Sequence, residues 1–352
     1  MLDTINIERF RGIRALCLED LGKVNIFVGT NATGKTSVLE AISMIANPTA
    51  VQWLVTLSQW REMPPPSRAN DDTLRVFFYD LDVSQPVKFE FTLDGQQNSL
   101  LVEGIAGGTV VSTAADTHSA AASPMATEPL TELRGVKLVY RRPGENAVES
   151  RLNLIEVGFQ AEAGSGVQRL GAFHVHARRA SSPGETARLL TSLYETKREG
   201  ELLELLRRVD PRITRLWPGV RNSGPTVMVD VGLARSLPMN VLGDGFCRVA
   251  LMVTGLLSGD ARLLIVDEID SGLHHSIMHS VWEGIIGIAG DKQVFCATHN
   301  EEMLRATLGA FGEHHDWLRV FRLDRHEDGT LTAQKYTYET YDISDKAGLE
   351  IR

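Results

Sequence analysis

Gly29-Thr30-Asn31-Ala32-Thr33-Gly34-Lys35-Thr36 is the stretch that decides the fold of this chain of 352 residues. A short apolar strand at 25–28 leads into it, and Ser37–Ile45 has the apolar spacing of a helix. A strand, a glycine-bearing loop and a helix in this order distinguish a true phosphate-binding loop from a chance match. Glycines let successive backbone N–H groups point at phosphate oxygens, and the helix N-terminus adds partial positive charge. The stretch therefore predicts a nucleotide-binding P-loop in an α/β fold.

The positions of this loop have distinct expected roles. Lys35 is expected to bridge the β- and γ-phosphates of ATP, and the Thr36 hydroxyl to hold Mg²⁺. The competing interpretation, a glycine-rich turn without a ligand, does not account for the strand and helix on either side. The residues expected to contact the nucleotide are Gly29, Asn31, Ala32, Thr33, Gly34, Lys35, Thr36 and Ser37.

A second signal is the apolar run 263–266 followed directly by Asp267 and Glu268. Four apolar residues predict a central parallel strand buried on both faces. The two acids then lie at its carboxyl end, where open α/β sheets bind ligands. Two carboxylates beside phosphates would repel them without a cation, so Asp267 is assigned to Mg²⁺ and Glu268 to the general base that orients water. A strand ending in a solvated acidic turn is the alternative, and the P-loop weighs against it.

A third apolar strand, 293–298, ends at His299. A single histidine is more often structural, but its place after the acid pair favours contact with the γ-phosphate or the water. A glutamine that senses the γ-phosphate and joins the metal ligands is expected after the first helix. Gln52 is preferred for this role, with Gln59 as the alternative.

The order of these motifs along the chain resembles that of the ABC-type ATPases. Their amino-acid sequences resemble those of the AAA-type ATPases of the OLD-like (overcoming lysogenization defect) group. Phe10-Arg11-Gly12, the 31–36 loop and Asp267–His275 carry the resemblance, which covers 1–48 and about 173–352. It implies a P-loop NTPase of ABC type, with a mixed central sheet flanked by helices. It places the signature turn at Gly243, Asp244 and Gly245, where Gly243 replaces the usual serine.

The resemblance also implies how such a protein works. ATP would be held between two copies, with Lys35, Thr36, Asp267 and Glu268 from one and the signature turn from the other. The expected assembly is a homodimer or a higher oligomer. OLD-like proteins are phage-defence and toxin-like ATPases, many with a Toprim nuclease. The tail after His299 reads as strands and leaves no room for a nuclease of roughly 100 residues. A separate effector protein is therefore expected.

Three regions are predicted along the chain. Residues 1–59 and 173–352 form the two halves of the ATPase domain, and 60–172 form a β-rich insertion with a flexible loop at about 104–126. Strands are expected in the insertion at Arg75–Tyr79, Val87–Leu93 and Val136–Arg141. A hairpin is expected near the end of the chain, with strands at 318–323 and 330–336.

Composition limits the partners. A net charge of −9 argues against a nucleic-acid-binding surface over the whole molecule. A DNA-clamping repair or recombination ATPase is the alternative function. A local arginine patch could bind DNA or a partner, but an ordinary charged helix surface is the favoured interpretation of it. The patch comprises Arg207, Arg208, Arg212 and Arg215. No apolar run is long enough for a membrane span, and no signal peptide is recognised. Three isolated cysteines suit buried thiols in a reducing cytoplasm.

Overall fold

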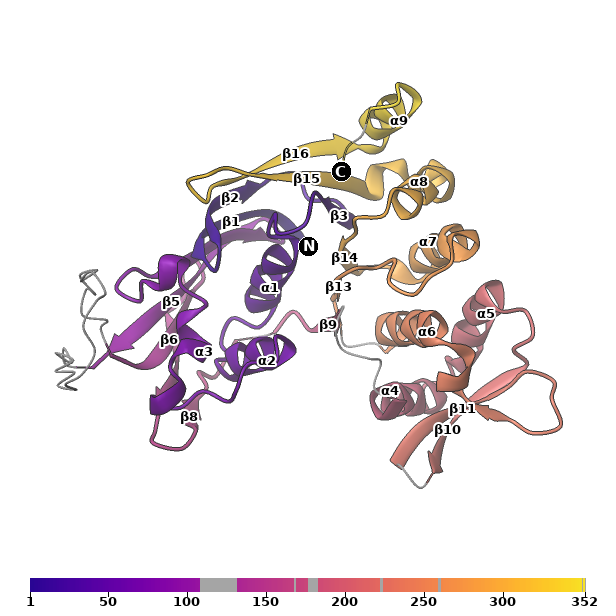
Figure 1. Cartoon of the computed structure of the whole chain (residues 1–352), viewed down its shortest axis with the longest axis horizontal. Coiled ribbons are helices and arrows are strands. Elements are labelled where there is room, and N and C mark those ends of the chain that lie inside the picture. The colour runs from indigo at the N-terminus through magenta and orange to yellow at the C-terminus, as the bar shows by residue number, and fades with distance from the viewer. Residues whose placement is uncertain are drawn as a thin grey trace, which may run out of the picture.

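The chain forms layers on both sides of a central six-stranded sheet, as Figure 1 shows. A computed structural model describes residues 1–107, 132–167, 169–176, 183–221, 224–258, 261–349 and 351. No helix in these ranges is long and apolar enough to cross a membrane.

The central sheet joins the two ends of the chain. Its strand order is β16-β15-β3-β14-β13-β9, with β16 antiparallel to β15 and every other pair parallel. This mixed sheet confirms the predicted P-loop NTPase fold of ABC type. Because the five parallel strands run the same way, their carboxyl ends meet at one edge. The strands are β3 (Val24–Val28), β9 (Ala172–Val175), β13 (Leu263–Val266), β14 (Gln293–Ala297), β15 (Leu318–Arg325) and β16 (Leu331–Thr337).

A second, antiparallel sheet of seven strands has the order β2-β1-β4-β5-β6-β7-β8. Strands from 87–162 continue the sheet that the N-terminus begins, through the pairing of β1 with β4. The predicted division of the chain into regions at residues 59 and 172 stays a prediction. The seven-stranded sheet contains strands from both sides of the boundary at 59. The strands are β1 (Leu2–Phe10), β2 (Ile13–Leu18), β4 (Val87–Leu93), β5 (Gln96–Ala106), β6 (Leu133–Arg141), β7 (Val148–Leu154) and β8 (Phe159–Glu162).

The predicted strand at Arg75–Tyr79 is wrong, because α3 (Asp72–Arg75) and the 3₁₀ turn η2 (Tyr79–Leu81) occupy it. Its apolar run packs into the core from helical turns, and local pattern alone cannot distinguish this from a strand. The loop predicted at 104–126 lies outside the described residues from 108 onward, and 104–106 belong to β5.

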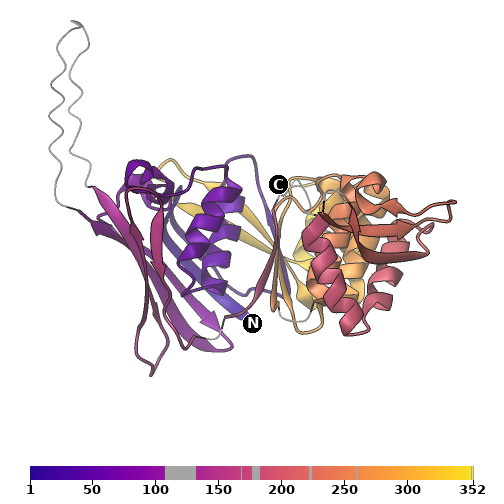
Figure 2. The ribbon, with the colours of Figure 1, turned by 90° about the horizontal axis from the view of Figure 1, so that it is seen from below.

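Alternating side chains connect the layers. Val24, Ile26 and Val28 of β3 pack with the helices on one face, whereas Phe27 packs with α1 (Lys35–Ala46) on the other. In Figure 2, α1 lies against the seven-stranded sheet, and the helices of residues 183–310 lie beyond the central sheet. The remaining helices are α2 (Gln52–Trp60), α4 (Pro183–Glu195), α5 (Glu199–Val209), α6 (Asp244–Leu257), α7 (His275–Ala289), α8 (Glu301–Ala310) and α9 (Tyr338–Lys346).

Smaller elements complete the chain. A three-stranded sheet lies beside α4, and the turns η1 (Arg68–Asn70), η3 (Met239–Leu242) and η4 (Gly312–Trp317) are 3₁₀ helices. The predicted C-terminal hairpin is confirmed as β15 and β16, but the tail ends in a helix that was not expected. Cys17 is exposed, contrary to the expectation of buried thiols. The strands of the small sheet are β10 (Arg215–Arg221), β11 (Gly224–Asp230) and β12 (Leu237–Pro238).

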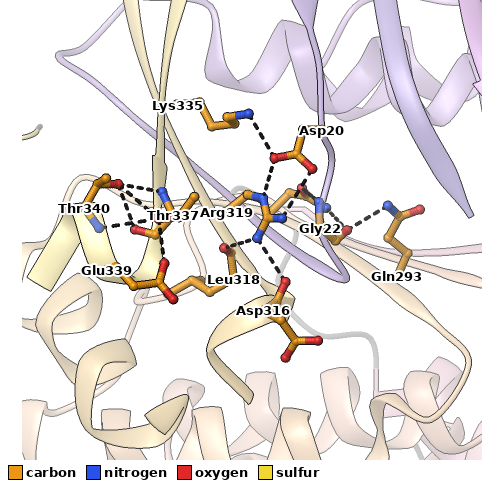
Figure 3. Close-up of polar contacts among 11 residues, drawn as sticks. Asp20, Gly22, Gln293, Asp316, Leu318, Arg319, Lys335, Thr337, Glu339 and Thr340 are labelled. Atoms are coloured by element: carbon orange, nitrogen blue, oxygen red, sulfur yellow. Dashed lines mark hydrogen bonds and ion pairs between the residues drawn. The ribbon is translucent and has the colours of Figure 1, made fainter. Parts of the chain in front are cut away.

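Polar side chains fasten the C-terminal hairpin to the N-terminal strands (Figure 3). Asp20, in the β2–β3 turn, accepts from Arg319 of β15 at 3.0 Å and from Lys335 of β16 at 2.9 Å. The buried Gln293 amide donates to the carbonyls of Leu2 and Gly22, and its oxygen accepts from the Leu2 N–H at 2.9 Å. One side chain therefore joins β14, β1 and the β2–β3 turn.

We expect Gln293→Ala to lower the free energy of unfolding by about 2 kcal/mol, because the buried N–H and carbonyl of Leu2 lose this partner, while the Gly22 carbonyl keeps the hydrogen bond from the Asn25 amide. Urea denaturation followed by far-UV circular dichroism measures the change. The matched control is Gln96→Ala, an exposed strand glutamine, which should shift stability by less than about 0.5 kcal/mol. Equal stabilities of the two variants would contradict this role of Gln293.

Candidate functional site

The loop between β3 and α1 has the backbone shape of a P-loop. Gly29 and Gly34 have φ values of 144° and 99°, in the left-handed region that side chains rarely adopt. A Cβ at Gly29 would lie 2.7 Å from the Leu323 carbonyl oxygen, so only glycine fits. The Lys35 ammonium donates to the carbonyls of Gly29 at 2.7 Å and Thr30 at 2.9 Å. This lysine is therefore folded over the loop at the place where phosphates would lie.

The acids lie beside the start of α1. The Thr36 hydroxyl donates to the Asp267 carboxylate at 3.0 Å, although 231 positions separate them in sequence. Burial raises the pKa of Asp267, partly offset by this hydrogen bond. A hydroxyl and a carboxylate oxygen so close together are hard ligands that fit Mg²⁺. Glu268, the second residue after β13, has a φ of 50° and an exposed side chain.

Most of the predicted site residues line one cavity of about 770 Å³. Its size lies within the usual range for small-molecule sites. Residues of the P-loop, the acids after β13 and His299 all line it, together with residues that the sequence did not predict. The lining residues that the sequence predicted are Asn31, Ala32, Gly34, Lys35, Thr36, Ser37, Asp267, Glu268 and His299.

Neither predicted glutamine reaches this cavity. Gln52 begins α2 and Gln59 lies near its end, and both are exposed and absent from the cavity lining. The cavity is lined instead by Arg61, which follows α2 directly. The structure therefore gives no support for Gln52 as a metal ligand.

An ion triad under the P-loop helix orients two guanidinium groups that line the cavity. Glu40 of α1 has a side chain only 3% exposed and pairs with Arg11 at 2.5 Å and with Arg61 at 2.8 Å. Burial lowers the pKa of Arg11 to about 10, while Glu40 opposes that shift. The Arg11 guanidinium also lies 4.2 Å from the centre of the Phe77 ring. The sequence predicted no role in the site for either arginine. The Phe10-Arg11-Gly12 motif was noted only for its family resemblance, and it contains one of them.

The signature turn, residues 243–245, lies apart from the cavity. Gly243 and Asp244 are exposed at the N-terminus of α6, and Gly243 has a φ of 100°. A Cβ at Gly245 would lie 2.0 Å from the Gly272 carbonyl oxygen, so the turn packs closely on the segment after β13. None of the three residues lines the cavity of its own chain.

Arg248 connects α6 with the acid pair. Its guanidinium donates to the backbone carbonyls of Asp267 and Glu268, the second at 3.1 Å, and to that of His176 at 3.3 Å. Desolvation lowers the pKa of this arginine, and the nearby carboxylates oppose the shift. The signature helix therefore holds the backbone that carries the acids.

The chain is an ATPase with the head fold of the ABC and SMC proteins. Its strand order, P-loop and acid pair define that fold, and two family profiles describe AAA-type domains. A profile described as "AAA domain, putative AbiEii toxin, Type IV TA system" matches residues 138–305, and one described as "AAA ATPase domain" matches residues 1–94. The chain thus carries AAA-type ATPase domains.

Three individual proteins are similar to this chain. An "ATP/GTP phosphatase" of Helicobacter pylori is 21% identical over 86% of both chains. The "DNA replication and repair protein RecF" of Acinetobacter baylyi is 30% identical over 26% of this chain and 24% of its own length. An SMC head, crystallised with the C-winged helix domain of ScpA, aligns with a TM-score of 0.54 over 97% of this chain and 99% of its own, at 10% identity. That structural likeness concerns the fold alone.

We expect Asp267→Asn to raise the free energy of unfolding of the ligand-free protein at neutral pH. Burial holds the folded pKa of Asp267 above its unfolded value, so the ionised carboxylate destabilises the fold above that raised pKa. The gain should shrink as pH falls through the raised pKa, where the wild-type carboxyl takes up a proton.

The same substitution should lower metal-dependent ATP turnover at least about 100-fold, because it removes a carboxylate ligand. Thermal denaturation at several pH values and a phosphate-release assay measure the two effects. A variant less stable than wild type at neutral pH would contradict the first expectation, and retained turnover the second.

Proposed function

We propose that this ATPase dimerises around ATP and acts as the sensor, scaffold or regulator of a separate effector in an anti-phage defence or toxin–antitoxin-like system. The observation that carries the first part is the separation of the signature turn from the cavity. One chain supplies the P-loop, the acid pair and His299, but no signature residue lines its cavity.

The exposed end of α6 is suited to complete a second copy's site. No side chain caps its N-terminus among the described residues, and the backbone N–H groups of its first turn favour an anion. Asp244 and Gly243 are exposed there, with nothing within 4 Å of a Cβ placed at Gly243. In a two-fold dimer, this turn would cover the γ-phosphate bound by the partner, and each copy would complete the other's site.

The roles of the remaining residues follow from their positions. Lys35 would leave the loop carbonyls and bind the β- and γ-phosphates, while Thr36 and Asp267 would hold Mg²⁺, which offsets phosphate charge. Glu268 would accept a proton from the water that attacks the γ-phosphorus, and His299 would hydrogen-bond the γ-phosphate. The bond to the bridging oxygen breaks, giving ADP and phosphate. Loss of the γ-phosphate would then release the two copies.

Similarity supports a role in a toxin–antitoxin-like system and the binding of a second polypeptide. The matching family profile is named for a putative toxin of a toxin–antitoxin system. The similar SMC head was crystallised with a domain of another polypeptide, ScpA. We propose by analogy that this head also binds a different chain, the effector, which should co-purify with it from the native host.

A DNA-clamping ATPase is the second candidate, and the similarity to RecF favours it. The predicted arginine patch gives the DNA-clamping candidate little support, because two of its arginines already have partners within the chain. Arg207 donates to the carbonyls of Ile213 and Thr214, and Arg212 pairs with Asp210 at 2.7 Å. Binding of duplex DNA that weakens steeply with salt would favour this candidate, because each phosphate contact releases counterions.

We expect Asp244→Arg to abolish ATP-dependent dimerisation, because a bulky cation would occupy the face that covers the partner's nucleotide. Asp244 is chosen because it is exposed, whereas a side chain at Gly245 would collide with Gly272. Light scattering with ATP and Mg²⁺ measures the assembly, in a Glu268→Gln background that slows hydrolysis.

The matched control is Asp316→Arg in the same background, an exposed acid outside the cavity and the signature turn. It should dimerise with ATP as the parent does. An Asp244→Arg protein that still dimerises with ATP would refute the shared site.

A further inference from the structure

The cavity extends well beyond the space that the phosphates need, and the sheet order gives its direction. The P-loop follows β3, His299 follows β14, and the acids follow β13. In the sheet, β14 and β13 both lie on the same side of β3. On the other side of β3 lies β15, which ends at Arg325. A nucleotide with its γ-phosphate at the acids has room to extend its ribose and base toward β15, because Arg325 at the end of β15 lines the same cavity.

A compact wall formed by residues 78–81 closes this end. The Tyr79 hydroxyl donates to the Asp328 carbonyl at 3.0 Å, which fastens the wall to the β15–β16 turn. Arg9 pairs with Asp82 at 3.0 Å and holds the other end of the segment. Phe78, Tyr79, Asp80 and Leu81 all line the cavity, as does Arg325 from the hairpin.

Two opposite charges in this part of the cavity are not paired. Neither the Asp80 carboxylate nor the Arg325 guanidinium makes a hydrogen bond or an ion pair with any described residue. Both side chains are exposed, so water solvates them until a ligand replaces it. The Arg325 guanidinium lies beside Gly12, 3.0 Å from where a Cβ would be, so a larger residue there would displace it.

The backbone presents Asp80 and Leu81 in an uncommon conformation. Their φ values are 53° and 58°, in the left-handed region, which is unusual for leucine. Leu81 is nevertheless 48% exposed, so no burial of its side chain compensates for that conformation. Strain of this kind is concentrated at ligand sites. An apolar side chain beside a free carboxylate suits a base that has a flat face and a donor edge.

We propose that this end of the cavity binds guanine, so that the protein hydrolyses GTP at least as well as ATP. This rests on the nucleotide site of the proposed function and names its base. Guanine offers the O6 and N7 acceptors to an arginine, a pairing common in nucleic-acid recognition. Its N1–H and N2 amino group are donors that a carboxylate accepts. Adenine carries an amino group in place of O6 and has no N1–H, so it makes fewer hydrogen bonds with Arg325 and Asp80.

The test compares kcat/KM for GTP, ATP and ITP in the full-length protein, with inorganic tripolyphosphate as the ligand without a base. Wild type should give a GTP-to-ATP ratio of one or more. Asp80→Asn should lower that ratio about tenfold, because the amide repels the donor edge of guanine. Arg325→Ala should also lower it, while tripolyphosphate binding stays unchanged in Asp80→Asn.

Asp316→Asn is the matched control, since it makes the same change at an exposed acid outside the cavity lining and outside the 78–81 wall. It should leave the ratio unchanged. A wild-type ratio well below one, or an Asp80→Asn effect equal for GTP and ATP, would overturn the guanine assignment while leaving ATP turnover intact. Lys35→Ala tests the nucleotide site itself, since full activity toward both nucleotides in that variant would refute the proposed function instead.

Discussion

The parallel pairing of β3 with β14, and of β14 with β13, is the constraint on which the rest of the structure depends. It aligns the carboxyl ends of strands from distant parts of the chain at one sheet edge. There the Thr36 hydroxyl meets the Asp267 carboxylate at 3.0 Å. The buried layers on both faces fix this register, because shifting a strand by one residue would turn its apolar set to the wrong face. The cavity, the ion triad and the signature helix are all placed by this sheet.

Local signals in the sequence predicted the P-loop and the acid strand because their chemistry depends on consecutive residues. Residues positioned by distant contacts were missed. Arg61 lines the cavity through its ion pair with Glu40, and Asp80 does so because Tyr79 is fastened to Asp328. Neither partner lies within ten positions of the residue it places. The pairing of β1 with β4 was unpredictable for the same reason, and the turn at 75–79 resembled a strand because both bury apolar residues.

The separation of the signature turn from the cavity makes two copies necessary for a complete site in the proposed mechanism. Within one chain, that turn packs on Gly272, and Arg248 binds the carbonyls that follow β13. Capture of a partner's nucleotide at the turn would therefore act on the chain's own acids through rigid contacts. Such a linkage would let the two sites of a dimer respond together, which suits a protein that signals to a separate effector.

Mixing two inactive variants tests the shared site most directly. Lys35→Ala removes the phosphate-binding lysine, and Asp244→Arg blocks the signature turn, so each homodimer should be inactive. In a mixed dimer, the Asp244→Arg chain supplies an intact P-loop and the Lys35→Ala chain an intact signature turn, which restores one site. An equal mixture should therefore recover roughly a quarter of wild-type ATP turnover, since half of the dimers are mixed and each has one working site of two. No recovery on mixing, or full activity of Asp244→Arg alone, would contradict a site shared between two copies.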